Sequence, residues 1–183
     1  MIGVLRRISW LPHFWTKTTF SLRGRDLNPL VNIASILVVC DGNHCRSPIG
    51  EALFRVAMGD GMLVGSAGLT ALHGVPAAPE ALALMSELGL DISRHRGRQL
   101  TAAMALEADL ILVMDERQKA DCERLVPSTR GRVYLLGHWQ SAASQGIADP
   151  FQKGPAAFRQ ALEHIRRSVA DWPSHLVHKQ RSA

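Results

Sequence analysis

The sequence has few cysteines, no long hydrophobic run and no internal repeat. Three cysteines among 183 residues suit a reducing compartment better than a disulfide-built secreted fold, so we expect a cytoplasmic protein. Residues 61–79 lack charged side chains, but their glycines and prolines exclude a stable membrane-spanning helix. The apolar residues 8–15 are interrupted by Pro12 and make a poor signal peptide. We therefore expect no stable membrane insertion.

Excess positive charge is confined to the N-terminus. Residues 1–35 hold five basic residues against one acidic residue, which is +4 of the net charge of +5. Nucleic-acid binding would need basic residues clustered on a folded face, and we expect no such partner. We expect residues 1–35 to be a disordered extension, although Trp10 and Trp15 could dock it to a partner or membrane surface. Residues 36–173 are expected to form one domain, followed by a tail at 174–183.

The most informative segment is Cys40–Pro48, which reads Cys-Asp-Gly-Asn-His-Cys-Arg-Ser-Pro. It lies between an apolar, β-branched run at residues 36–39 and apolar residues at helical spacing, so we expect it to connect a strand to a helix. Backbone N–H groups in such a loop converge on an anion, and the helix N-terminus favours a thiolate. Arg46 can bind two phosphate oxygens with its planar fork. The segment predicts a phosphate-cleaving enzyme with Cys40 as nucleophile.

The other loop residues have expected backbone roles. Gly42 is predicted to give the tight loop its conformational freedom, and Asn43 to tolerate a left-handed conformation. Ser47 followed by Pro48 is predicted to cap the helix. The scattered histidines lack neighbouring ligands, so we expect no metal site.

Apolar segments and helical patterns alternate along the rest of the chain. Strands are predicted at 36–39, 62–66, 109–114 and 132–136, and helices after the loop and at 79–88, 116–124 and 155–172. This alternation favours a single three-layer α/β domain with a four-stranded parallel sheet. The active site is then expected at the carboxyl end of the first strand.

Ile36–Phe54 resembles the signature of the low-molecular-weight protein tyrosine phosphatase family, and the similarity extends to about Trp172. The resemblance implies hydrolysis of phosphotyrosine without metal or cofactor. Cys40 would form a phosphocysteine intermediate, Arg46 would bind the phosphate, and Ser47 would stabilise the thiolate as leaving group. The residues implied to surround the phosphate are Asp41, Gly42, Asn43, His44, Cys45, Arg46 and Ser47.

Further matches lie outside the loop. Asn43, Ser66 and His95 match residues that brace the loop by hydrogen bonds. Asp149-Pro150-Phe151 matches an Asp-Pro-aromatic motif, whose aspartate protonates the departing phenolate and then activates water. The chemistry requires such an acid independently, because an unprotonated phenolate or alkoxide leaves poorly. Phe151 is expected to line the slot for the substrate ring, with Leu69 as a candidate for the other wall.

Two loop residues depart from the family pattern. Asp41 stands where the family usually has an uncharged residue, so its carboxylate either lies near the bound dianion and weakens binding or points to solvent. His44 stands where tyrosine-specific members commonly have an aliphatic residue and protein-arginine phosphatases a small polar one. A protein-arginine phosphatase is therefore an alternative.

The remaining cysteines bear on regulation and on a second alternative. Cys40 and Cys45 could close a reversible disulfide that protects the nucleophile, as in family members, or Cys45 could be a buried thiol that fills space. Cys122 is expected to be a bystander. A thiol-dependent arsenate reductase shares this fold and loop but needs a relay of further cysteines. A phosphopeptide-binding module without turnover is a third class.

A short motif concerns the partner. Gly137-His138-Trp139 is similar to members associated with bacterial exopolysaccharide systems, although a packing tryptophan explains it equally well. That resemblance implies a phosphotyrosine protein as partner, such as a bacterial tyrosine autokinase.

Overall fold

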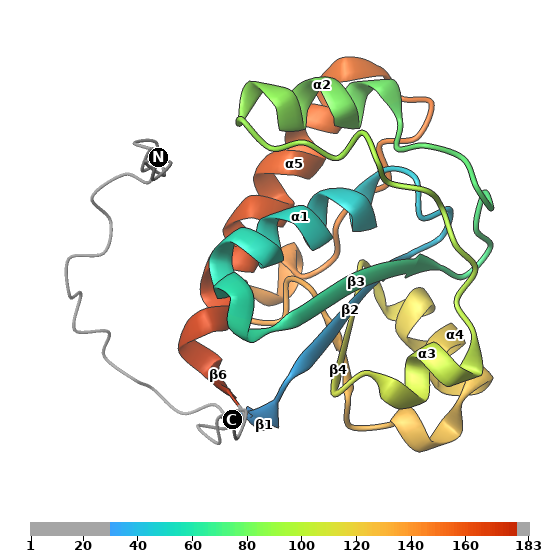
Figure 1. Cartoon of the computed structure of the whole chain (residues 1–183), viewed down its shortest axis with the longest axis vertical. Coiled ribbons are helices and arrows are strands. Elements are labelled where there is room, and N and C mark those ends of the chain that lie inside the picture. Colours follow the sequence, from blue (N-terminus) through green and yellow to red (C-terminus); the bar gives the residue numbers. More distant parts are fainter. Residues whose placement is uncertain (1–29, 179–183) are drawn as a thin grey trace, which may run out of the picture.

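A four-stranded parallel sheet forms the centre of the fold, with strands in the order β3-β2-β4-β5 (Figure 1). The computed structural model describes residues 30–178, so the expectations for residues 1–29, including Trp10 and Trp15, and for residues 179–183 lie outside it. The strands are β2 (Ser35–Cys40), β3 (Leu63–Gly68), β4 (Leu110–Val113) and β5 (Val133–Leu135).

Helices cover both faces of the sheet, as predicted for a three-layer domain (Figure 1). One face carries α1 (Arg46–Met58), α2 (Pro79–Glu87) and α5 (Gly154–Asp171), and the other carries α3 (Ala102–Glu107) and α4 (Glu116–Leu125). Strand β2 alternates between the two cores, because Ile36 and Val38 pack on the α1 side and Leu37 and Val39 on the α4 side. This two-sided burial fixes the position of Cys40 at the end of β2.

Parallel pairing brings the carboxyl ends of three strands to one edge of the sheet. Cys40 is in register with Gly68 at the end of β3, and Val38 with Leu112 near the end of β4. A side chain on Gly68 would lie 2.5 Å from the carbonyl oxygen of Asp41, so glycine is required for β3 to end against the loop. The segments after these strands therefore surround Cys40, as expected for an open parallel sheet.

The predicted elements are confirmed to within about two residues, and three elements were missed. Helix α3 was not predicted, although Thr101 caps it by accepting a hydrogen bond from the backbone N–H of Met104 at 3.2 Å. Strands β1 (Leu30–Ile33) and β6 (Leu176–His178) pair in parallel as a separate two-stranded sheet. The folded unit therefore extends beyond the predicted boundaries of residues 36 and 173.

Trp139 of the Gly-His-Trp motif belongs to an aromatic cluster in the core on the α1 side of the sheet. Its ring stacks on His175 with centroids 3.6 Å apart, and it lies edge-on to Trp172 at 5.7 Å. Trp172 is fully buried and donates its indole N–H to the carbonyl oxygen of Leu136 at 2.8 Å. The motif thus joins the end of β5 to the segment after α5.

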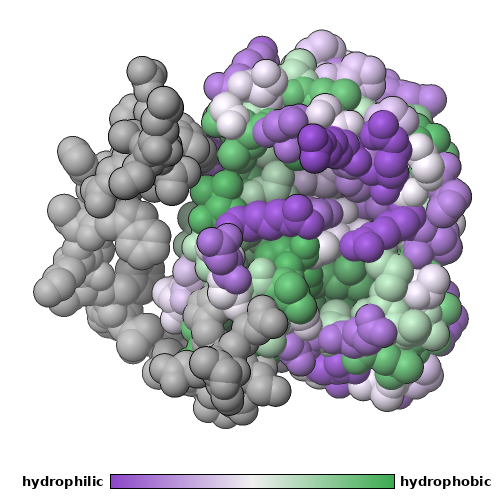
Figure 2. All heavy atoms as spheres, viewed as in Figure 1, coloured by the Kyte–Doolittle hydropathy of each residue, from purple (hydrophilic) through white to green (hydrophobic). Residues whose placement is uncertain are grey.

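Hydrophilic side chains cross the face that carries α1 and β3 (Figure 2). A groove of about 500 Å³ lies between α1, β3 and residues 90–98, and its basic lining includes Arg55, Arg94, Arg96 and Arg98. Within residues 30–178, no helix is both long and apolar enough to cross a membrane. The same part of the chain has no cluster of three or more His, Cys, Asp or Glu side chains arranged to hold a metal ion.

Candidate active site

The loop after β2 places its reactive groups at the start of α1. Cys40 is the last residue of β2, and Arg46 is the first residue of α1. Asn43 adopts the left-handed conformation, with a φ of 49°, as predicted. Gly42 has no positive φ, and a Cβ there would meet only ordinary contacts of 3.7 Å or more. The predicted need for glycine at position 42 is therefore not supported, and Asn43 makes the turn.

Hydroxyl and amide groups hold the nucleophile from inside the protein. The Ser47 hydroxyl lies 3.0 Å from Cys40 Sγ and accepts a hydrogen bond from Asn43 Nδ2 at 2.8 Å. The predicted capping role of Ser47 is wrong, because the N-cap position is Cys45 and makes no side-chain cap. The hydroxyl is directed to the nucleophile instead, where it can stabilise a thiolate.

The residues expected to brace the loop converge on Asn43. Its Nδ2 also donates to the Ser66 hydroxyl at 2.9 Å, and its Oδ1 accepts from the backbone N–H of Arg98 at 2.9 Å. His95 Nε2 lies 2.7 Å from the Asn43 carbonyl oxygen. The Ser66 hydroxyl in turn donates to Glu51 Oε2 at 2.5 Å. Every polar side-chain atom of Asn43 is thus used to fix the loop.

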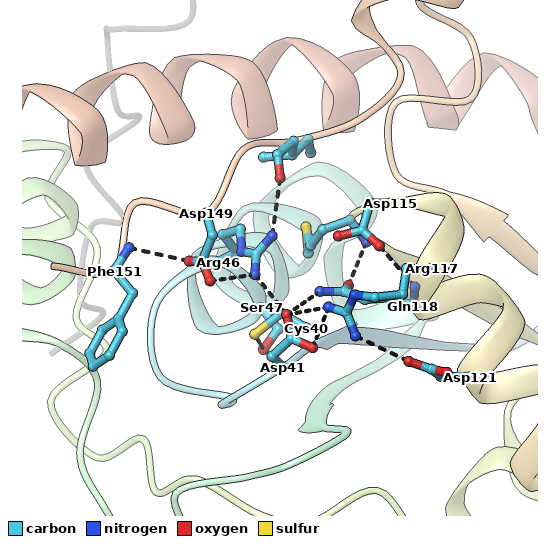
Figure 3. A network of polar contacts seen from close by, with 12 residues as sticks. Cys40, Asp41, Arg46, Ser47, Asp115, Arg117, Gln118, Asp121, Asp149 and Phe151 are labelled. Atoms are coloured by element: carbon cyan, nitrogen blue, oxygen red, sulfur yellow. Dashed lines mark hydrogen bonds and ion pairs between the residues drawn. The ribbon is translucent and has the colours of Figure 1, made fainter. Parts of the chain in front are cut away.

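The Arg46 guanidinium lies at the centre of the site (Figure 3). It is 3% exposed, donates from Nη1 to the Ile147 carbonyl oxygen at 3.1 Å, and pairs through Nη2 with Asp149 Oδ2 at 3.0 Å. Its Nε–H is buried and has no hydrogen-bond partner among residues 30–178. A buried donor of this kind is costly to leave unpaired, and a phosphate oxygen would satisfy it.

Asp149 reaches the loop from the segment between β5 and α5. Its side chain is 44% exposed, and its Oδ1 accepts from the backbone N–H of Phe151 at 3.2 Å. The fold thereby brings the predicted acid to the predicted phosphate clamp, from 103 positions further along the sequence. Both carboxylate oxygens are oriented, one by Arg46 and the other by the turn at Pro150.

The expected substrate walls are only partly where the sequence placed them. Phe151 is 46% exposed, and its ring centre is 6.1 Å from that of His44 in an edge-on arrangement. His44 is held by a 2.7 Å contact between Nδ1 and the Pro76 carbonyl oxygen. Leu69 instead packs against the core on the α4 side. Leu72 is 43% exposed and lies beside Gly42 of the loop.

Asp41 is directed to the Arg46 phosphate clamp rather than to solvent, and two residues of α4 hold it there. Arg117 Nη2 lies 2.7 Å and 2.8 Å from its two carboxylate oxygens, and Gln118 Nε2 donates to Oδ2 at 2.8 Å. Arg46 Nη2 donates to the same Oδ2 at 3.2 Å. Burial alone would raise the pKa of Asp41, but hydrogen bonds from Arg117 and Gln118 and the charges of Arg117 and Arg46 bring the pKa below its usual 3.8.

The remaining cysteines are buried thiols. Burial, with a smaller effect of the neighbouring Cys40, raises the pKa of Cys45 to about 12. Burial likewise raises the pKa of Cys122, which packs in the core between α4 and the sheet, to about 12. Both thiols are therefore protonated at neutral pH and poor nucleophiles in this state. A redox role for Cys45 stays a prediction.

Sequence reasoning missed Arg117, Gln118 and Ile147. The missing signal was positional: Arg117 and Gln118 begin the helix that follows β4, and the carboxyl ends of adjacent parallel strands meet at one edge. Ile147 contributes only a backbone carbonyl oxygen, so its side chain gave no clue.

A thiol and a buried arginine on one strand-to-helix loop, with a carboxylate brought to the arginine from a second segment, define a cysteine-dependent phosphatase site. The family model for low molecular weight phosphotyrosine protein phosphatases matches residues 35–182, and the chain belongs to this family. The chain is 47% identical over 140 residues to a probable low molecular weight protein-tyrosine-phosphatase, EpsP of Ralstonia nicotianae, covering 76% of this chain and 94% of EpsP.

Solved structures agree with this assignment. The crystal structure of the tyrosine phosphatase AmsI of Erwinia amylovora has a TM-score of 0.75 and 40% identity, covering 79% of this chain and 93% of that one. The YwlE arginine phosphatase of Geobacillus stearothermophilus has a TM-score of 0.69 and 30% identity, covering 74% of this chain and 88% of that one. Both substrate classes therefore occur among proteins with this fold.

Proposed function

We propose that this protein is a protein-tyrosine phosphatase that works through a phosphocysteine intermediate. The Cys40 thiolate attacks phosphorus in line while the bond to the phenolic oxygen breaks, and Asp149 donates its proton to that oxygen. Water then attacks phosphorus, Asp149 takes a proton from the water, and the sulfur–phosphorus bond breaks to release phosphate and the thiolate. Family membership and the geometry of these groups support the proposal.

One observation carries the proposal furthest. Arg46 lies on the same loop as Cys40 and forms an ion pair with the acid Asp149. Its buried Nε–H has no hydrogen-bond partner among the described residues. Phosphate bound at this guanidinium would lie against both the nucleophile and the acid. Ser47, 3.0 Å from the sulfur, would stabilise the thiolate when it departs.

Phosphotyrosine is favoured over phosphoarginine by the apolar character of the entrance. Phe151 and Leu72 are exposed beside the loop and suit the flat ring of a phosphotyrosine. The greater identity to the protein named as a tyrosine phosphatase than to the arginine phosphatase points the same way. An arsenate reductase is disfavoured, because Cys122 is buried in the core on the opposite side of the sheet from Cys40.

We also propose a tyrosine autokinase of exopolysaccharide synthesis as substrate and the cytoplasm as location. The similarity to EpsP and AmsI supports the substrate. A reducing compartment would keep the three cysteines, which are all free thiols in the structure, from oxidation.

The test compares metal-free hydrolysis of phosphotyrosine and phosphoarginine peptides. Cys40→Ser should lower turnover by at least about 10³-fold, because a hydroxyl is a far weaker nucleophile than a thiolate. Asp149→Asn should lower phosphotyrosine turnover by about 10²–10³-fold but affect dinitrophenyl phosphate little, because that leaving group needs no proton.

The control is Cys122→Ala, which should keep wild-type turnover. Phosphotyrosine hydrolysis that persists in Cys40→Ser would refute the mechanism. Preference of the wild-type protein for phosphoarginine would replace the proposed substrate. Arsenate reduction that depends on Cys122 would replace the proposed enzyme class.

A further inference from the structure

A negatively charged residue directly after the nucleophile is unfavourable for an enzyme whose ligand is a dianion. Asp41 has a lowered pKa and is therefore a carboxylate at neutral pH. It lies 3.2 Å from the Arg46 guanidinium, which must also bind the phosphate. An uncompensated carboxylate at this position would repel the ligand and compete for Arg46.

We infer that Arg117 is a positioning residue that neutralises Asp41 and so permits the dianion to bind at Arg46. Arg117 comes from the first turn of α4, across the sheet edge from the loop, and bonds both carboxylate oxygens of Asp41. Figure 3 shows Asp41 between the two arginines. The inference rests on the proposed function and adds a determinant of affinity.

The geometry of α4 fixes this arrangement. Asp115 caps the helix by accepting the backbone N–H of Gln118 at 2.8 Å. The fully buried Gln118 accepts the backbone N–H of Met114 through Oε1 at 3.0 Å, which leaves its Nε2 to donate to Asp41. Arg117 is 58% exposed, but the other terminal nitrogen of its guanidinium, Nη1, pairs with Asp121 Oδ2 at 3.1 Å.

Arg117 and the catalytic groups share one hollow. A cavity of about 370 Å³ is lined by residues of the loop, of the start of α4 and of the acid segment, among them Asp41, Arg46, Arg117 and Asp149. The lining carries three carboxylates, Asp41, Asp115 and Asp149, but only two guanidiniums, so Arg117 supplies one of its two positive charges. Removal of Arg117 would leave Asp41 with Arg46 as its only cationic partner, without removing any group that touches the reacting atoms.

The test is a double-mutant cycle of Arg117→Gln and Asp41→Asn, with Arg124→Gln as the matched control. Arg124 lies on the same helix, also pairs with Asp121 and is 74% exposed, but it does not contact the loop. The readouts are KM and kcat for a phosphotyrosine peptide and the inhibition constant of inorganic phosphate. Thermal unfolding checks that each variant folds.

Arg117→Gln should raise KM and the phosphate inhibition constant about tenfold and change kcat less than about twofold, because the lost charge acts on binding. The second substitution, Asp41→Asn, should restore most of the affinity, and added salt should shrink the defect. Arg124→Gln should behave like wild type.

A wild-type KM in Arg117→Gln would overturn the inference, as would a defect that Asp41→Asn does not relieve or one confined to kcat. These outcomes leave the proposed function intact if the wild-type protein still hydrolyses the peptide. Failure of the wild-type protein to do so would refute the proposed function itself.

Discussion

The two flanks of the phosphate loop are built from different chemistry. The inner flank, which we define as Asn43, Ser47, Ser66 and His95, holds the loop by hydrogen bonds of hydroxyl, amide and imidazole groups. The outer flank, Asp41 with Arg117 and Gln118, holds it by ion pairs and one amide.

Most side chains of the inner flank are also more deeply buried than the ion pair of the outer flank. Asn43, Ser47 and Ser66 are at most 1% exposed, whereas the ion pair of the outer flank, Asp41 with Arg117, is 28% and 58% exposed and only the amide Gln118 is fully buried. Buried polar groups are costly to leave unpaired, but exposed ion pairs contribute little to stability. The inner flank therefore sets the geometry of the loop, and the outer flank sets the charge that the substrate meets.

The largest effect is expected for Asn43→Ala. The Asn43 side chain donates to the buried hydroxyls of Ser47 and Ser66 and accepts from the backbone N–H of Arg98, so loss of these three hydrogen bonds should lower the free energy of unfolding by about 2–3 kcal/mol. Displacement of the loop should lower kcat about 10²-fold. Urea unfolding and steady-state kinetics measure the two losses.

Asn43→Gly separates backbone strain from lost hydrogen bonds. Glycine adopts a φ of 49° freely, so it should recover the strain part of the stability loss and none of the kcat loss. Recovery of kcat in the glycine variant would show that the side-chain hydrogen bonds of Asn43 are dispensable and would break the distinction between the flanks.

Ser66→Ala is expected to have a smaller effect of the same kind. Asn43 Nδ2 keeps its bond to Ser47, and Glu51 keeps its 2.6 Å ion pair with Arg55, so the loss should be about 1 kcal/mol and a few-fold in kcat. Ser168→Ala is the control, because the buried Ser168 hydroxyl has no partner in the described part of the chain. Ser168→Ala should be as stable as wild type or more stable. A Ser66→Ala variant that matches it in free energy of unfolding and in kcat would contradict the role of Ser66 in holding the loop.

The smallest effect is expected for the contribution of the Asp41 carboxylate to the free energy of unfolding, which depends on pH. The pKa of Asp41 is lower in the folded protein than the usual 3.8, so its carboxylate stabilises the fold above that pH and this contribution is lost as the pH falls through the lowered pKa. At pH 5–7 the free energy of unfolding of the wild-type protein should exceed that of Asp41→Asn by at most about 1 kcal/mol, because the ion pair is partly exposed.

Urea unfolding of both proteins between pH 7 and pH 2.5 measures this difference. It should be constant down to about pH 5 and then shrink. A difference that grows as the pH falls would mean that the Asp41 carboxylate opposes folding.

Local pattern was enough to predict the central fold. Strands β2 to β5 and helices α1, α2, α4 and α5 have strong apolar periodicity, and their order alone favours a parallel sheet. Strands β1 and β6 could not be predicted, because these short segments, more than 140 residues apart, pair only with one another. Tertiary pairing of this kind has no local signal.

The site residues likewise divide into those with a local sequence signal and those brought together only by the tertiary fold. The loop and the Asp149 motif are local, so their residues could be identified in the sequence. The contact of Arg117 with Asp41 spans 76 positions and depends on the register between β2 and β4. For Ser47, the local Ser-Pro pattern predicted a helix cap, which is wrong, whereas the family resemblance implied the role beside the Cys40 thiolate where the hydroxyl lies.

The central claim is that Cys40 carries the phosphoryl group during turnover. The most direct measurement is rapid mixing of wild-type protein with a phosphotyrosine peptide, acid quenching within one turnover, and mass spectrometry of the fragment that contains Cys40 and Cys45. We predict a phosphoryl group on Cys40 that is absent from Cys40→Ser and appears at the rate of the first phenol release. Phenol release without any phosphorylated cysteine, or with phosphate on Cys45, would contradict the mechanism.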